Sequence, residues 1–361
     1  MSSLSSFASS RLARLFALSL VGLALASGCN SGSKSGSGSG SDGGKSAAKQ
    51  LKLLNVSYDP TRELWKQVNA AFIPEYEKKT GTKLEIKQSH GGSGSQARGV
   101  IDGVDADVVT LAIWPDVDQI RKAGLIADNW ENRLPNGSLP YTSTIVFVVR
   151  KGNPKGIKDW NDLIKPDVKV ITPNPKISGN GKLSLLAAWG SVTERGGSAE
   201  DAEKFLAALY KNVPILDSGA RGATITFAKN GQGDVHLTWE NEAHLELAEY
   251  KDDGLEIVYP PISVLAEPTV AWVDENVKKK GTAEAAKAYL EFLYTQEGQE
   301  IIAKNYYRPT DKATLERFSK NFQPITLFKV EKIAGNWTQA QAKFFDEGAI
   351  FDKIYEKPAG K

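Results

Sequence analysis

Hydrophobic and polar positions follow two different periods from residue 51 onward. The stretch LKLLNVS (51–57) is a largely apolar run typical of a buried strand, and KLEIKQ (83–88) alternates as a second strand. Between them, DPTRELWKQVNAAF (59–72) repeats its large apolar residues at helical spacing. The folded part of the chain is therefore predicted to begin with a strand–helix–strand unit.

The same unit recurs along the chain. Further strands are expected at 106–111, 168–172, 234–239 and 255–259, with helical segments between them such as 199–210 and 285–293. Strands that alternate with helices favour mostly parallel sheets with helices on both faces. The predicted fold class is α/β.

Two long extended segments interrupt this alternation, YTSTIVFVVRKGNP and IVYPPISVLAEPTVAWVD. We interpret them as crossings between two lobes, which suits a chain of this length and permits hinge closure. Residues 51–143 and 264–361 would form the first, discontinuous lobe, and residues 144–263 the second.

The N-terminus has the pattern of an export signal. Arg11 and Arg14 precede an apolar run at 15–26 that is too short to span a bilayer comfortably. We expect residues 1–28 to be a signal peptide and residues 29–50 a flexible Gly/Ser tether. The mature chain is expected to be periplasmic or otherwise extracytoplasmic.

The only cysteine of the chain, Cys29, ends the string LASGC, which resembles the lipobox of bacterial lipoproteins. A lone cysteine excludes a disulfide within the chain, and a flexible tether directly after it favours lipidation of Cys29 over a free thiol. The alternative is cleavage after Ala26 and simple secretion.

Composition excludes several functional classes. The 45 lysines and arginines nearly balance 43 aspartates and glutamates, without the basic block that tracks nucleic acid. Three histidines and one cysteine do not supply a zinc cluster, and no spaced carboxylate loop suggests another metal. No metal or cofactor is predicted.

Four turns after predicted strands share one chemistry: SYDPT, SHGGSGS, NPKISGNG and DSGARGAT. Each is rich in small or capping residues and is expected to open a helix, whose first N–H groups lack internal partners. Those groups and the positive end of the helix dipole attract an anion. Helix starts meet at the carboxyl ends of the strands in an open α/β sheet, so the turns are expected to converge on one ligand.

Each of these features also has a plain structural explanation. In the first turn, Asp59 is expected to cap its own helix ahead of Pro60, with only its N–H facing a ligand. Trp239 ends the strand of DVHLTWENEA and offers a donor-only indole, although a core tryptophan explains it equally. It is the joint occurrence of the four turns that favours an anion site.

A secreted serine hydrolase is an alternative from a different class. Ser93 and Ser178 lie among small residues, and His90 is three residues from Ser93. However, the chain has no G-x-S-x-G elbow, and a nucleophilic serine needs an oriented base. The glycine loop also lacks the Gly-Lys-Ser/Thr of a phosphate-binding Walker motif.

Several strings resemble the sulfate/thiosulfate-binding proteins of bacterial ABC importers, among them LLNVSYDPTREL, QSHGGSGSQA, VITPNPKISGNGK, DSGARGAT and TWENEA. The resemblance runs from about 51 to 351. It implies a two-lobed periplasmic-binding-protein fold of type II, hinged by two crossing strands. It also implies a monomeric, non-enzymatic receptor that delivers its anion to a permease driven by a cytoplasmic ATPase.

In that family, neutral donors hold a dehydrated sulfate. Carried over by position, the resemblance implies that five backbone N–H groups bind the anion, those of Asp59, Ser93, Gly179, Asn180 and Ala220. It also implies that the hydroxyl of Ser178 and the indole N–H of Trp239 donate to it. The best-known members have a glycine in place of Asn180, so its side chain is expected to alter the rim of the pocket and the balance between sulfate and thiosulfate.

A pocket of donors alone suits sulfate, because sulfate carries no proton at neutral pH and only accepts hydrogen bonds. Phosphate keeps a hydrogen that would find no acceptor, and an unsatisfied buried polar group costs about 1 to 3 kcal/mol. Thiosulfate, molybdate and other tetrahedral oxyanions remain alternative ligands at this point.

Overall fold

The computed structural model describes residues 50–355. The predicted signal peptide, Cys29 and all of the predicted tether except its last residue lie outside this range. Within it, no helix combines the length and the apolar character needed to cross a membrane.

The first sheet has the strand order β10-β3-β1-β2. Its strands are β1 (Gln50–Tyr58), β2 (Lys83–Gly91), β3 (Val108–Leu111) and β10 (Thr269–Trp272). β1 runs parallel to β2 and β3, whereas β10 is antiparallel to β3. The register sets Tyr58 beside Gly91, so the turns that follow β1 and β2 leave the sheet at the same edge.

Helices cover both faces of this sheet because successive side chains of β1 point to opposite sides. Leu53 packs in one apolar cluster with Trp65 of α1, and Val56 packs in another with Val117 of α3. The helices of this half are α1 (Arg62–Thr80), α2 (Ser93–Ile101), α3 (Trp114–Lys122), α4 (Pro135–Ser138), α9 (Asp274–Lys280), α10 (Ala283–Phe292), α11 (Gln296–Lys304) and α12 (Lys312–Arg317).

The second sheet has the order β12-β9-β4-β7-β5-β6, and β8 and β11 also pair with β4. Its strands are β4 (Tyr141–Val149), β5 (Val170–Pro173), β6 (Leu216–Asp217), β7 (Val235–Trp239), β8 (Glu256–Val258), β9 (Ile262–Ala266), β11 (Arg308–Pro309) and β12 (Thr326–Phe328). β5 is parallel to β6 and β7, and Pro173 lies beside Asp217. The turns that follow β5 and β6 therefore leave the second sheet at the same edge.

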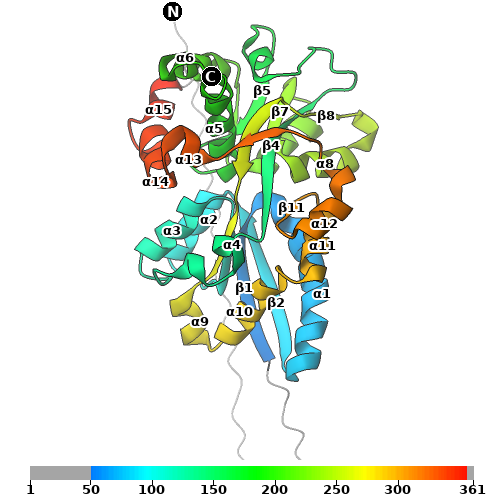
Figure 1. The fold of residues 1–361 in the computed structure, drawn as a ribbon, viewed down its shortest axis with the longest axis vertical. Helices are drawn as coiled ribbons and strands as arrows, with labels where there is room; N and C mark the ends of the chain where they lie inside the picture. The colour runs from blue at the N-terminus through cyan, green and yellow to red at the C-terminus, as the bar shows by residue number, and fades with distance from the viewer. Residues whose placement is uncertain (1–49, 356–361) are drawn as a thin grey trace, which may run out of the picture. The chain divides into compact units, whose positions relative to one another are not determined.

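The helices of the second half include four that follow its strands or connect them: α5 (Gly179–Thr193), α6 (Ala199–Lys211), α7 (Ala220–Thr224) and α8 (Glu240–Glu249). α5 is buried on nearly every side between strands and neighbouring helices. Two sheets flanked by helices confirm the predicted α/β class (Figure 1). The second sheet is mixed rather than mostly parallel as expected, because its central strand β4 is antiparallel to β7, β8, β9 and β11.

The chain passes between the sheets where the two extended segments were expected. β4 follows the helices of the first half but pairs with β7 of the second sheet, and β9 is separated from β10 of the first sheet by two residues. Both crossings are visible in Figure 1 as strands that join the two halves.

The C-terminal segment departs from the predicted lobe assignment. β12 pairs with β9, and two of the following helices, α13 (Val330–Ala334) and α15 (Ile350–Ile354), pack against α5 and α6 of the second half. Between them, α14 (Trp337–Ala340) also contacts α3 of the first half. Tyr210 of α6 contacts Phe351 edge-on at 5.3 Å between ring centroids, and Phe344 contacts Trp189 of α5 at 4.9 Å. Phe344 and Phe351 thus pack against helices of the second half, although residues 264–361 were expected in the first lobe.

Candidate functional site

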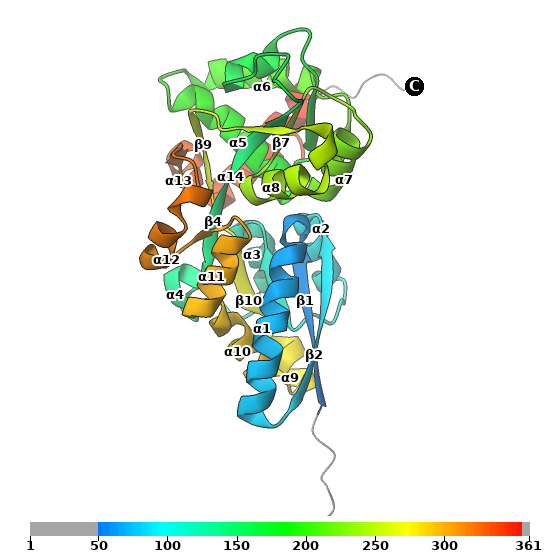
Figure 2. The ribbon, with the colours of Figure 1, turned by 90° about the vertical axis from the view of Figure 1, so that its right-hand side faces the viewer.

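All seven predicted site residues line one small cavity between the two sheets. Figure 2 shows α7 and α8 of the second half next to α1 and α2 of the first half. Asn241, the second residue of α8, donates to the Pro60 carbonyl at 3.0 Å. The lining residues are Tyr58, Asp59, Pro60, Gly91, Gly92, Ser93, Ala112, Ser178, Gly179, Asn180, Ala220 and Trp239. The four turns therefore converge as the sequence predicted.

Each turn contributes the first residues of a helix. Asp59 follows β1 and opens the short 3₁₀ turn before α1, and Ser93 is the first residue of α2. From the other half, Gly179 begins α5 and Ala220 begins α7. The first N–H groups of a helix have no partner within it and carry the positive end of the dipole, so these positions suit an anion.

The two serines use their side chains differently. Ser178 caps α5, and its Oγ accepts a hydrogen bond from the Gly181 N–H at 3.3 Å, which leaves the hydroxyl hydrogen to donate elsewhere. Ser93 Oγ accepts from the Ala112 N–H at 3.0 Å. The Ser93 hydroxyl is also directed to the Asp116 carboxyl, where burial raises the pKa and the hydrogen bond from Ser93 lowers it. The backbone N–H of Ser93 is therefore the group available to the cavity.

Trp239 is both a packed residue and a donor. Its side chain is fully buried, and its ring lies 5.2 Å from that of Tyr58. Within residues 50–355 its indole Nε1 has no hydrogen-bond partner. Leaving a buried donor unsatisfied costs about 1 to 3 kcal/mol, so an acceptor in the cavity is favoured.

The side chain of Asp59 does not cap the helix, contrary to the expectation from its sequence position. The N-cap residue is Tyr58, without a side-chain cap, and Asp59 Oδ1 instead accepts from Arg62 Nη2 at 2.9 Å. Arg62 lies one helical turn further on, which brings the guanidinium back over the carboxylate. The negative charge beside the cavity is thereby compensated locally.

Cationic side chains are absent from the described lining of the cavity. The buried side chain of Lys182 lines a separate groove together with Gly94 and Asp116. Its Nζ lies 3.8 Å from Asp116 Oδ1 and donates to Gln341 Oε1 at 3.0 Å. Burial raises the pKa of the Asp116 carboxyl, and Lys182 opposes that shift. An anion in the cavity would therefore meet dipoles rather than a free ammonium or guanidinium group.

Glycine is required where the two halves touch. A Cβ on Gly92 would lie 2.8 Å from the Ser218 carbonyl oxygen, and one on Gly179 would lie 2.5 Å from the Ala112 Cβ. A Cβ on Gly219 would collide with the Asp59 carboxylate. Three of these positions, Gly92, Gly219 and Ala112, were not predicted from the sequence, although the glycine pair at 91–92 is typical of a close backbone approach.

The geometry does not assemble a serine hydrolase. His90 Nδ1 lies 3.3 Å from the Tyr58 carbonyl oxygen and 3.4 Å from Thr61 Oγ1, and burial lowers its pKa. Over the described range, no hydrogen bond joins Ser93 or Ser178 to a histidine, and no cluster of three His, Cys, Asp or Glu side chains suits a metal. His90 therefore contacts the turn that follows β1 rather than either serine.

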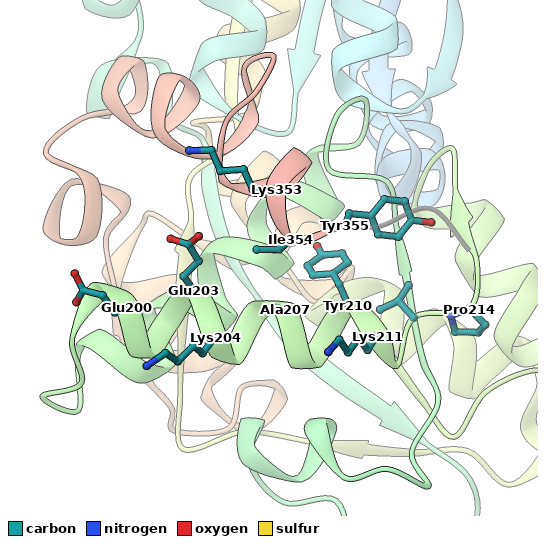
Figure 3. Close-up of a pocket in the computed structure, with 11 residues that line it drawn as sticks. Glu200, Glu203, Lys204, Ala207, Tyr210, Lys211, Pro214, Lys353, Ile354 and Tyr355 are labelled. Atoms are coloured by element: carbon teal, nitrogen blue, oxygen red, sulfur yellow. The ribbon is translucent and has the colours of Figure 1, made fainter. Parts of the chain in front are cut away.

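A larger groove lies elsewhere, between α6 and the residues around α15 (Figure 3). Glu200, Lys204 and Lys211 project from α6 beside it, and Tyr355 closes one side. None of the seven predicted residues lines this groove.

The chain is similar to known solute-binding proteins. The family model described as bacterial extracellular solute-binding protein matches residues 64–308. A sulfate-binding protein of Escherichia coli strain K12 is 55% identical over 86% of this chain and 94% of its own length. A thiosulfate-binding protein of Pseudomonas aeruginosa is 46% identical over 95% of this chain and 98% of its own.

Among solved structures, the sulfate-binding protein SubI of Mycobacterium tuberculosis H37Rv superposes with a TM-score of 0.75. The two sequences are 31% identical, and the match covers 82% of this chain and all of SubI. Fold, site and sequence agree with the predicted periplasmic-binding-protein architecture: the chain belongs to the bacterial extracellular solute-binding protein family.

Proposed function

We propose that the chain is an extracytoplasmic receptor that binds sulfate through Asp59, Ser93, Ser178, Gly179, Asn180, Ala220 and Trp239 and delivers it to an ABC importer. The observation that carries this proposal is the unpartnered, fully buried indole N–H of Trp239 in a cavity entered by several helix N-termini. A dianion with four acceptor oxygens would satisfy these donors together.

Thiosulfate is the second candidate ligand. Thiosulfate has the same charge as sulfate and differs from it only by a sulfur atom in place of one oxygen. The Pseudomonas aeruginosa relative is a thiosulfate-binding protein of nearly equal length. Molybdate and phosphate fit less well, since phosphate retains a hydrogen and the relatives described above are named for sulfur oxyanions.

Calorimetric titration of the purified chain with sulfate, thiosulfate, molybdate and phosphate tests the proposal. Saturable binding of sulfate with much weaker phosphate binding is expected. Ser178→Ala should weaken sulfate binding by about 1.5 to 3 kcal/mol, because it removes a hydrogen bond to a charged group. Saturable phosphate binding without a sulfate response would overturn the assignment.

The receptor is proposed to act as a monomer and to have no enzymatic activity of its own, in line with relatives named for binding. It is further proposed to stay at the membrane through a lipid on Cys29 after removal of residues 1–28, with residues 29–50 as the tether. Intact-mass measurement of the membrane fraction tests the anchor, with Cys29→Ser as the control that should release the chain. Sedimentation tests the monomer.

A further inference from the structure

The side chain of Asn180 has a fixed orientation in the wall of the cavity. Asn180 is the second residue of α5 and is 3% exposed. Its Nδ2 donates to the Leu237 carbonyl oxygen at 3.0 Å. Since a carbonyl oxygen only accepts hydrogen bonds, the amide nitrogen of Asn180 must face Leu237, and its amide oxygen must point away from Leu237.

That oxygen is an unusual group for this site. Among the described residues, Asn180 Oδ1 is buried and has no hydrogen-bond partner, while Trp239 Nε1, in the same wall, is a buried donor without one. A ligand that only accepts would satisfy Trp239 and leave Asn180 unsatisfied. A ligand that accepts at most positions and donates at one would satisfy both.

We propose that Asn180 is a specificity-determining residue whose amide oxygen lowers the discrimination of the site against tetrahedral oxyanions that keep one hydrogen, such as monohydrogen phosphate. This inference rests on the proposed function as an oxyanion receptor. The amide oxygen accepts the O–H of such an anion, whereas its lone pairs oppose an oxygen of sulfate. Sulfate binds because the donors outnumber this single acceptor.

The test is a comparison of phosphate and sulfate dissociation constants in the wild type, Asn180→Gly and Asn180→Leu. Competition calorimetry is performed at mildly alkaline pH, where phosphate keeps one hydrogen and matches sulfate in charge. Both substitutions should raise the ratio of phosphate to sulfate Kd at least about tenfold, with sulfate bound more tightly than by the wild type. Asn180→Leu keeps the approximate volume, so it separates the acceptor from space filling.

Asn212 provides a matched control. Its buried Nδ2 likewise donates to backbone carbonyls, those of Leu163 and Lys165 at 2.8 Å, but Asn212 does not line the cavity. Asn212→Leu should lower stability and leave the Kd ratio unchanged.

The outcomes separate this inference from the proposed function. Sulfate binding with an unchanged Kd ratio in both Asn180 variants overturns the inference alone, as does phosphate binding that is undetectable in the wild type and the variants alike. A wild type that fails to bind sulfate overturns the proposed function and this inference with it.

Discussion

Arg308 and Glu240 form a bidentate ion pair, with Nε 2.7 Å from Oε2 and Nη2 2.8 Å from Oε1. Glu240 is fully buried, begins α8 and directly follows Trp239. Arg308 belongs to β11, which pairs with the crossing strand β4. Burial raises the pKa of Glu240, and Arg308 opposes that shift. The pair links the residue that directly follows Trp239 to the crossing strand β4.

Removal of the guanidinium should be costly. Arg308→Met would leave the Glu240 carboxylate buried without its partner, and breaking a buried pair typically lowers the free energy of unfolding by about 3 to 5 kcal/mol. Urea unfolding measures this loss, and sulfate titration should show weaker binding because Trp239 loses its support.

Arg317 supplies the control for that experiment. Its ion pair with Glu300 at 2.8 Å is largely exposed, with 49% of the Arg317 side chain accessible. Exposed pairs contribute about 1 kcal/mol or less, so Arg317→Met should change stability little. Equal losses in the two variants would contradict a special role for Arg308.

Trp239→Phe should separate ligand binding from packing. The substitution removes the unpartnered Nε1 and keeps an aromatic ring against Tyr58. Sulfate affinity should fall by about 1.5 to 3 kcal/mol, since a donor to a charged ligand is lost. Binding by calorimetry and unfolding by urea are measured in parallel.

Trp160→Phe is the matched control, because its Nε1 already donates to the Ile262 carbonyl at 2.7 Å. It should lower stability and leave sulfate affinity unchanged. A Trp239→Phe variant with wild-type affinity would remove the indole from the site.

The residues of the candidate site could be predicted because they follow local sequence signals. Pairings between distant parts of the chain could not be predicted in this way. Ser93, Ser178 and Ala220 stand at helix starts that small residues announce within a few positions. The partner of Arg308 lies 68 residues away, and β12 pairs with a strand more than 60 residues earlier in the chain. No local pattern encodes such contacts, which is why the packing of 326–354 and the pairing of Glu240 were not foreseen.

Gly179→Ala should hinder the approach of the two halves. The added Cβ would lie 2.5 Å from the Ala112 Cβ and 3.3 Å from the Ser93 Cβ, so Gly179 and Ala112 must separate. Because the donors of both halves must reach one anion, sulfate affinity should fall at least about tenfold, or about 1.4 kcal/mol.

Gly99→Ala serves as the comparison, since a Cβ there meets only Val104 Cγ2 at an ordinary 3.6 Å inside α2. It should leave affinity unchanged and hold or raise stability, because alanine favours a helix over glycine. If both alanine variants bind sulfate like the wild type, close contact at Gly179 is not needed for binding.

Glu242 should make stability fall as the pH rises. Burial, followed by the charge of Glu246, raises the pKa of Glu242 from 4.5 to about 7. The folded state therefore binds the proton of Glu242 more tightly than the unfolded state does. The stability gained from this proton is full below pH 4.5 and is lost as the pH rises through about 7. Relative to Glu242→Gln, which stays neutral, the wild type should lose about 3 kcal/mol across this range.

The titration of His244 changes stability with pH in the opposite direction to that of Glu242. For this reason the wild type must be compared with the Glu242→Gln variant. Burial lowers the pKa of His244 to about 4, so its contribution weakens stability as the pH falls below 6.5. The wild-type curve alone would mix the two effects, whereas the difference between wild type and Glu242→Gln isolates Glu242, because His244 titrates in both. Urea unfolding at a series of pH values gives that difference, and curves that stay parallel from pH 4.5 to 7 would show that Glu242 ionises normally in the folded chain.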